Sequence, residues 1–213
     1  MPLRLTPVEA RILGCLMEKS VTTPDQYPLT LNSLTAACNQ KSSRHPVMSL
    51  SKGETQRTLR ELADKRVVVV DQNFKTQVEK YTHRFCNTPF SDYTFDSAQY
   101  AIVCTLLLRG SRTPGELRAN CSRLHNFLDN SQVIESLESL MSGDNPCVVM
   151  LPRVPGRRDN EYTHLFYGEI KGSEQTVTTP QKPTPQTATT NADLEQRVSQ
   201  LEIAVEELRK LIK

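Results

Sequence analysis

The segment YTHRF at residues 81–85 returns as YTHLF at residues 162–166. In both copies Tyr, His and Phe alternate with other residues, so on a β-strand their rings share one face. Each copy also closes a series of patterns that occur in the same order, which indicates an internal duplication. The architecture of the chain is therefore predicted twice, and the two predictions support each other.

Each series predicts three helices, an apolar strand and the returning strand that holds the repeated segment. The helices are expected at residues 7–18, 31–38 and 54–66 in the first unit and at residues 96–109, 114–121 and 131–142 in the second, with strands at residues 67–70 and 147–151. Three helices followed by a two-stranded β-hairpin form the layout of a winged helix-turn-helix domain. The predicted fold class is therefore α+β and mainly helical, with two tandem winged helix-turn-helix domains at residues 1–87 and 88–172. The first domain is expected to be longer by about nine residues between its second and third helices.

The last part of the chain differs in composition. Residues 173–192 are rich in Thr, Pro and Gln and nearly free of apolar residues, which predicts a disordered linker. Residues 193–213 then carry apolar side chains that alternate by four and three, the spacing of a coiled-coil seam. We expect a parallel homodimer through the following side chains: Leu194, Val198, Leu201, Val205, Leu208 and Ile212. A frayed amphipathic helix that docks on its own domains is the alternative, because so short a coiled coil is marginal alone.

The sequence contains features that bear on the cellular compartment of the protein. The N-terminus lacks the continuous apolar segment of a signal peptide, and no stretch has the length and apolarity of a transmembrane helix. The six cysteines have no C-x-x-C spacing and fall mostly in apolar helical patterns. A reduced cytoplasmic protein without a membrane partner is expected.

Charge is unevenly divided between the two units. Residues 1–87 hold thirteen Lys and Arg against eight Asp and Glu, whereas residues 88–172 hold eight against ten. The first unit is therefore the half that is suited to a polyanion.

A helix-turn-helix protein places its recognition helix in the major groove, so candidate DNA contacts are sought on the third helices and wings. In the first unit His45 accompanies the basic residues that precede the third helix. The candidate nucleic-acid contacts are Lys41, Arg44, Lys52, Gln56, Arg57, Arg60, Arg153, Arg157 and Arg158. The alternative is that Arg57 pairs with Glu61, and Arg60 with Asp64, as ordinary ion pairs on a helix surface.

The third helix of the second unit presents Glu135 and Glu138 and holds no Lys or Arg. It is a poor reader of a DNA groove and suits a protein contact or a dimer surface better. Its basic wing could follow a DNA backbone, although arginines around a Pro-Gly turn are also ordinary for an exposed hairpin.

Catalytic and metal chemistry find little support. His83 and His164 each lie between two aromatic residues on a strand, where a structural histidine is the expected role. No second pair of ligands completes a zinc site beside Cys86. The chain has no nucleotide-binding glycine motif, no G-x-S-x-G and no H-E-x-x-H. We expect no metal, no cofactor and no enzymatic activity.

The sequence resembles the YceH-like bacterial proteins, a family of unknown function, over essentially its whole length. The resemblance is carried by TTPDQYPL at residues 22–29, ACNQK at 37–41, PVMSL at 46–50, RFCN at 84–87, LLLRG at 106–110 and TPGELR at 113–118. It implies a tandem winged-helix fold in a bacterial cytoplasm and supplies no catalytic residues.

Two functions follow as hypotheses. The first is a non-enzymatic, dimeric protein that binds double-stranded DNA through the first domain, as a transcriptional regulator does. The second is a protein-interaction adaptor that binds a partner through the second domain. Fold alone does not decide between them.

Overall fold

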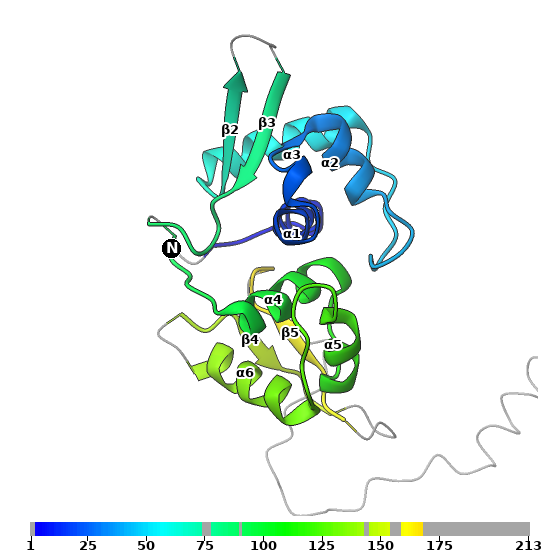
Figure 1. The fold of residues 1–213 in the computed structure, drawn as a ribbon, viewed down its shortest axis with the longest axis vertical. Helices are drawn as coiled ribbons and strands as arrows, with labels where there is room; N and C mark the ends of the chain where they lie inside the picture. Colours follow the sequence, from blue (N-terminus) through cyan, green and yellow to red (C-terminus); the bar gives the residue numbers. More distant parts are fainter. Residues whose placement is uncertain (1–2, 74–77, 90, 143–144, 154–158, 168–213) are drawn as a thin grey trace, which may run out of the picture. The chain divides into compact units, whose positions relative to one another are not determined.

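The computed structural model describes residues 3–73, 78–89, 91–142, 145–153 and 159–167. These residues form an α+β fold with more helix than strand, in the order α1, η1, β1, α2, α3, β2, β3, α4, α5, α6, β4 and β5 (Figure 1). The expected linker at residues 173–192 and the expected coiled coil at residues 193–213 lie outside the described residues.

Two similar series of elements make up the described chain. The first half contains α1 (Pro7–Thr22), a 3₁₀ turn η1 (Pro24–Gln26), β1 (Leu29–Thr30), α2 (Leu31–Cys38), α3 (Lys52–Asp64), β2 (Val68–Asn73) and β3 (Val78–His83). The second half contains α4 (Ser97–Arg109), α5 (Pro114–Cys121), α6 (Asn130–Ser142), β4 (Val148–Met150) and β5 (Tyr162–His164). The six predicted helices and both strand pairs are confirmed, with small differences at their ends.

The repeated segment has matching partners in both halves. β3 runs antiparallel to β2 with His83 opposite Val68, and β5 runs antiparallel to β4 with His164 opposite Val148. Because a shift of one residue would turn every side chain to the other face, the common register is specific. The duplication predicted from the sequence is therefore present in the strand pairing.

A third strand, which the sequence analysis did not predict, distinguishes the two halves. β1 pairs with β3, with Leu29 opposite Tyr81, and gives a sheet of order β1-β3-β2. At the corresponding place in the second half, Arg112 and Tyr162 form an isolated bridge through two backbone hydrogen bonds of 3.0 and 2.9 Å. The second half thus retains one bridge where the first has a short strand.

The connections between helices differ in length. Residues 39–51 join α2 to α3, whereas the shorter segment 122–129 joins α5 to α6. A second difference lies between the first two helices of each half, where residues 23–30 correspond to the shorter segment 110–113. The first half is therefore longer between its second and third helices, as predicted, but by less than the expected nine residues, because β1 and the turn before it take part of the extra length.

The first helix of each half begins with a capping box. The Thr6 backbone N–H donates to the Glu9 carboxylate at 2.7 Å, and the Glu9 N–H donates to the Thr6 hydroxyl at 3.3 Å. Asp96 and Gln99 make the same reciprocal pair at the start of α4. These bonds satisfy backbone donors that have no partner within the helix, so they fix where α1 and α4 begin.

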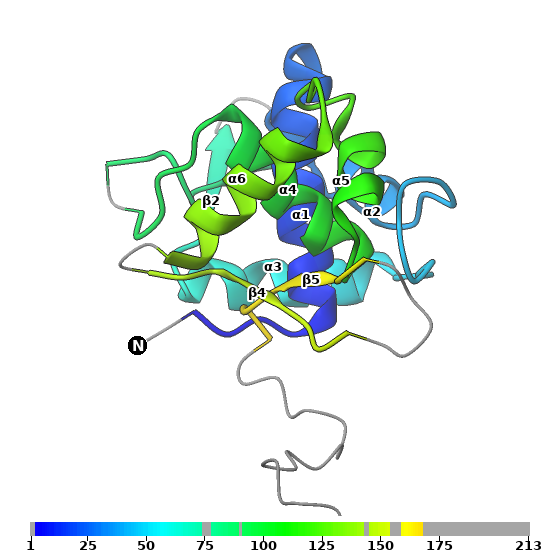
Figure 2. The same ribbon diagram turned by 90° about the horizontal axis from the view of Figure 1, so that it is seen from below.

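The two halves pack through α1 and α4 (Figure 1 and Figure 2). Residues 9–18 of α1 and 101–108 of α4 are buried without interruption, which is typical of helices that are covered on all sides. A Cβ on Gly14 would lie 2.9 Å from the Leu108 side chain, so glycine permits the close approach of the helices. The halves predicted as domains 1–87 and 88–172 share one hydrophobic core within the compact unit Met1–Ile170.

Candidate nucleic-acid interface

Helix α3 is positioned by its cap and by its apolar face. The Ser51 hydroxyl accepts from the Glu54 N–H at 3.2 Å, while the Ser51 N–H donates to the Glu54 carboxylate at 2.8 Å. Its buried side chains are Thr55, Thr58, Leu59 and Leu62. Because these four face the core, the opposite face is turned to solvent, and it carries Lys52, Arg57 and Arg60 exposed and Gln56 partly exposed.

The exposed cations of α3 form no close ion pair with the acidic side chains of the helix in the described part of the chain. Among the described residues, no ion pair joins Arg57 to Glu61 or Arg60 to Asp64. Hydrogen bonds from the Ser51 hydroxyl and N–H occupy the Glu54 carboxylate and lower its pKa. Lys52 and Arg57 lie in the first half of α3, Arg60 lies in its second half, and the acidic Glu61 and Asp64 follow toward its C-terminal end.

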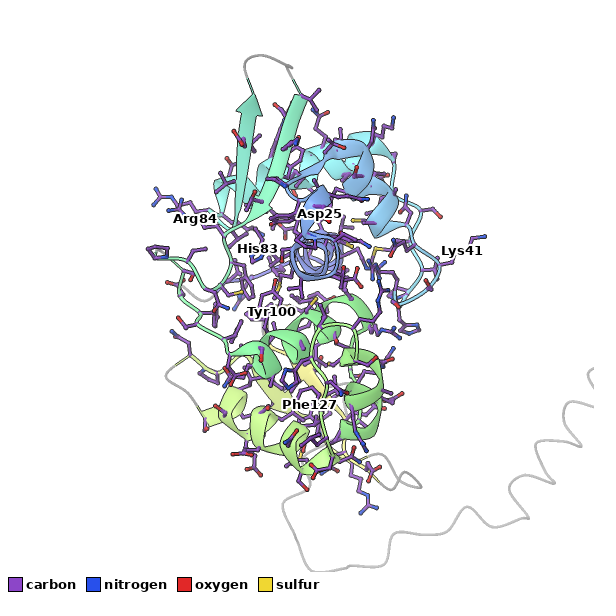
Figure 3. The ribbon with its side chains drawn as sticks, in the orientation of Figure 1. Asp25, Lys41, His83, Arg84, Tyr100 and Phe127 are labelled. Atoms are coloured by element: carbon purple, nitrogen blue, oxygen red, sulfur yellow. The ribbon has the colours of Figure 1, made fainter. Side chains whose placement is uncertain are left out.

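Lys41, another candidate contact, is exposed on the segment before α3 and projects away from the ribbon (Figure 3). The same segment is anchored at its far end, since the Asn39 side chain accepts from the Leu50 N–H and donates to the Leu50 carbonyl, both at 2.8 Å. His45 is exposed as well.

Arg44, in contrast, is turned inward. Its guanidinium donates to both carboxylate oxygens of Glu18 at 3.1 and 2.6 Å and to the Ala37 carbonyl at 3.1 Å, and the residue is 5% exposed. Burial alone would raise the pKa of Glu18, but the Arg44 guanidinium holds it below its usual value. Arg44 fastens the segment before α3 to α1, and it is not part of the exposed basic face as the sequence suggested.

Helix α6, the counterpart of α3, has a different outer surface. Glu135 and Glu138 are exposed, and the helix carries no basic side chain. Arg153 is exposed beyond β4, whereas the candidate contacts Arg157 and Arg158 lie outside the described residues. The outer surface of α3 therefore carries both basic and acidic side chains, whereas that of α6 carries acidic ones and no basic one.

His83 and His164 are held in the protein interior at the ends of the paired strands. Burial lowers the pKa of each to about 4, so both rings are neutral at physiological pH. The His164 Nδ1 accepts from the Phe166 N–H at 3.2 Å, and the ring stacks on Phe166 at a centroid distance of 5.6 Å. Within the described residues, no group of His, Cys, Asp and Glu is arranged to hold a metal ion.

All six cysteines are free and buried. Burial raises the pKa of Cys121 to about 11 and that of Cys86 and Cys147 to about 12. A thiol becomes a nucleophile by losing its proton, so these three behave as small apolar side chains.

The sequence analysis missed one structural cation. Arg11 lies on the otherwise apolar side of α1 and is 1% exposed. It donates to the Cys38 carbonyl at 3.1 Å, to the Pro46 carbonyl at 2.6 Å and to the Leu108 carbonyl at 3.5 Å. Cys38 ends α2 and Leu108 lies in the last turn of α4, so a single guanidinium serves the C-terminal ends of two helices. A lone Arg within an apolar helical stripe is the signal that could have revealed it.

In the described part of the chain, no helix combines the length and the apolar character needed to cross a membrane.

Comparison with known proteins gives relatives along the whole sequence. Residues 5–157 match the family described as "Protein of unknown function, DUF480".

Relatives named UPF0502 protein cover nearly all of the chain. The one from Shewanella piezotolerans is 49% identical over 210 residues, which are 99% of this chain and 96% of the relative. The one from Shewanella oneidensis is 48% identical over 214 residues, 97% and 95% of the two chains. A relative from Vibrio cholerae is 51% identical over 171 residues, 80% and 79% of the two chains. The resemblance to YceH-like bacterial proteins is thus confirmed, and the chain belongs to the uncharacterised DUF480 family, to which the UPF0502 proteins correspond.

Proposed function

We propose that this protein is a non-enzymatic, tandem winged-helix protein that binds double-stranded DNA through α3, in the manner of a transcriptional regulator. The order of helices and strands in the first half, with a short strand before the second helix and a strand pair after the third, is that of winged helix-turn-helix domains. In such domains the third helix enters the major groove, and the residues near its N-terminus reach the bases.

The observation that carries the proposal is the set of exposed basic side chains on α3. Lys52, Arg57 and Arg60 project from one helix, and among the described residues none of them forms an ion pair. Cations of this kind displace counterions from DNA and bind its phosphates, whereas Gln56 has the donor and acceptor geometry that reads adenine.

The test is a titration of the full chain against a random-sequence DNA duplex by fluorescence anisotropy, repeated at several salt concentrations. We expect Arg57→Ala/Arg60→Ala to weaken binding about tenfold or more and to reduce the slope of log affinity against log salt by roughly two. The matched control is Arg118→Ala/Arg123→Ala, which removes the same charge from exposed positions in the second half. The control should leave affinity within about twofold. Undetectable binding at low salt, or an equal loss in both variants, would reject the proposal.

We further propose that the protein acts as a homodimer in the cytoplasm. The heptad pattern of residues 193–213 supports the dimer, and six free thiols suit a reducing compartment. Light scattering of the full chain and of a chain that lacks residues 193–213 should give the masses of a dimer and a monomer. Equal protomer numbers in both would remove the coiled coil from the proposal.

A protein-interaction adaptor is the second candidate. It is favoured by exposed apolar side chains in the second half, where Leu128 is 74% exposed and Ile134 on α6 is 38% exposed beside acidic residues. Exposed apolar groups rimmed by charge are typical of protein contacts. A stoichiometric partner that the wild-type chain captures after nuclease treatment, and that Leu128→Ser/Ile134→Ser loses, would support this function over DNA binding.

A further inference from the structure

The third helices of the two halves carry opposite charges at equivalent positions. Their buried side chains have the same spacing and align the two helices residue by residue: Thr55, Leu59 and Leu62 on α3, and Val133, Leu137 and Leu140 on α6. In this alignment Arg57 of α3 corresponds to Glu135 of α6. Three residues further along, Arg60 corresponds to Glu138, and all four charged side chains are exposed.

The two charged groups of each helix are available to a partner. Within the described residues, neither the two guanidinium groups of α3 nor the two carboxylates of α6 form an ion pair. On each helix the two residues are three positions apart, so they lie on one face about one turn apart. Two such faces laid against each other would form both ion pairs at once.

One molecule does not bring its own two third helices together. α3 packs on α1 and α2, whereas α6 packs on α4 and α5. Figure 1 shows α1 and α4 between them. A contact between the two outer faces therefore requires a second copy of the chain.

The acidic end of α3 does not oppose this contact. When the two helices lie side by side in the same direction, Glu61 of α3 lies opposite Ser139 of α6. One turn further along, Asp64 lies opposite Ser142, so both carboxylates face neutral side chains. The exposed Ile134 of α6 adds an apolar group that the methylene stems of the arginines can cover.

We propose that the outer face of α6 is a docking surface for α3 of a second copy of this chain, with the two guanidinium groups of α3 against the two carboxylates of α6. Each docked copy keeps one free α3 or one free α6, so the association is head-to-tail and can add further copies. Exposed ion pairs are individually weak and are screened by salt, so the association is weak and salt-sensitive. It uses the same face of α3 as the proposed DNA contact but forms without DNA, and DNA would compete with it.

The experiment is static light scattering of the full chain in the absence of DNA, at about 0.05 M and about 0.5 M salt. The dependence of scattering on protein concentration gives the second virial coefficient, which is negative for net attraction between molecules and positive for net repulsion. The wild-type chain should show attraction at low salt and lose it at high salt, because salt screens the ion pairs.

A charge reversal on α3 tests the basic side of the contact. Arg57→Glu/Arg60→Glu takes the formal net charge from +2 to −2, so the general repulsion between molecules keeps its size while both third helices become acidic. The coefficient should become positive at low salt. The matched control Arg118→Glu/Arg123→Glu makes the same charge change at exposed positions outside the third helices and should stay attractive.

A charge exchange tests the pairing itself. Adding Glu135→Arg/Glu138→Arg to the α3 variant restores opposite charges on the two helices and the net charge of +2, so the attraction should return. Glu135→Gln/Glu138→Gln tests the acidic side alone and should abolish the attraction, which keeps the test decisive if circular dichroism shows that the exchanged variant is unfolded.

Three results would overturn the proposal: no attraction in the wild-type chain at low salt, equal losses in the α3 variant and its control, or a folded exchanged variant that remains repulsive. Because no DNA is present, these results leave the DNA titration unaffected. A chain that fails to bind DNA would, in turn, still show the salt-sensitive attraction.

Discussion

The two halves of the molecule are alike inside and different outside. His83 and His164 occupy the same register position and both are neutral, with His164 buried and His83 partly buried. The outer surfaces of the third helices diverge, since α3 exposes Arg57 and Arg60 where α6 exposes Glu135 and Glu138. The comparison teaches that packing preserves the buried pattern of a duplicated unit, because a core tolerates little change in volume or polarity, while exposed positions are free to acquire separate roles.

The largest expected effect concerns a buried ion pair that the first half alone holds among the described residues. Glu18 and Leu108 are equivalent positions, because each lies the same number of residues after the N-cap of its helix, α1 or α4. The second half therefore has an apolar residue where the first half has the carboxylate of the ion pair. Arg44→Met leaves the buried Glu18 carboxylate with only the more distant Lys19 ammonium, at 3.8 Å, and should lower the free energy of unfolding by about 3–5 kcal/mol. Urea denaturation measures this loss.

A double variant makes the first half resemble the second. Glu18→Leu/Arg44→Met should recover most of the lost stability, because an apolar pair can replace a buried ion pair at little cost. The control Arg118→Met removes an exposed guanidinium and should cost about 1 kcal/mol or less. An Arg44→Met protein as stable as wild type would show that the ion pair does not fasten the segment before α3.

The second prediction concerns the lowered pKa that His83 and His164 share. Their pKa of about 4 in the folded protein lies below the value near 6.5 expected when unfolded, so the unfolded state binds more protons between these values. Stability from each histidine is therefore complete above about pH 6.5 and is lost as pH falls toward 4, by up to about 3 kcal/mol each.

Urea denaturation at pH 7 and pH 5 measures this dependence. His83→Gln and His164→Gln should each flatten the pH dependence by a similar amount, whereas His45→Gln at an exposed position should leave it as in wild type. A variant in one half that flattens the curve while its counterpart does not would show that the two interiors differ.

The third prediction reverses the difference between the third helices. Glu135→Lys/Glu138→Lys replaces the two acidic side chains of α6 with basic ones and should raise affinity for duplex DNA about tenfold at low salt, with a steeper salt dependence. Anisotropy titration measures the change. Asp92→Lys/Asp159→Lys adds the same charge outside the third helices, and an equal gain in this control would mean that net charge alone governs binding.

The smallest effect concerns one glycine on α3. Gly53 is exposed, and a Cβ built there meets no atom within 4 Å, so Gly53→Ala should stabilise the protein by about 0.5–1 kcal/mol. Ser131→Ala at the same place on α6 should give about half of that gain. Thermal unfolding distinguishes them, and a loss of stability in Gly53→Ala would contradict the regular helical geometry of α3 at this residue.

Local patterns predicted much of the fold. The six helices followed from capping residues and apolar stripes, and the repeated segment predicted the strand pairs and their equivalence. The sequence analysis did not predict β1, because two residues are too few to show an alternating pattern. The strand forms by pairing with the edge of β3 that β2 leaves free. Of the candidate site, the exposed basic residues of α3 could be found from helical periodicity, since periodicity alone separates a buried face from an exposed one.

Other parts of the site depended on residues that are far apart in the sequence. Arg44 looked like any basic residue before a recognition helix, and only its approach to Glu18 of α1 makes it a buried anchor. Arg11 likewise became an internal group only because the carbonyls of Cys38 and Leu108, which are far from it in the sequence, lie within reach of its guanidinium.

The sequence by itself determined the duplication, the positions of the helices, the faces that must be buried and the charge difference between the halves, because these follow from local propensity and side-chain period. Only the tertiary structure decided that two apolar helices join the halves into a single core and that Arg11 and Arg44 are internal. The physical reason is that burial and hydrogen-bond partners depend on which distant segments meet, and a linear pattern specifies a face without specifying what covers it.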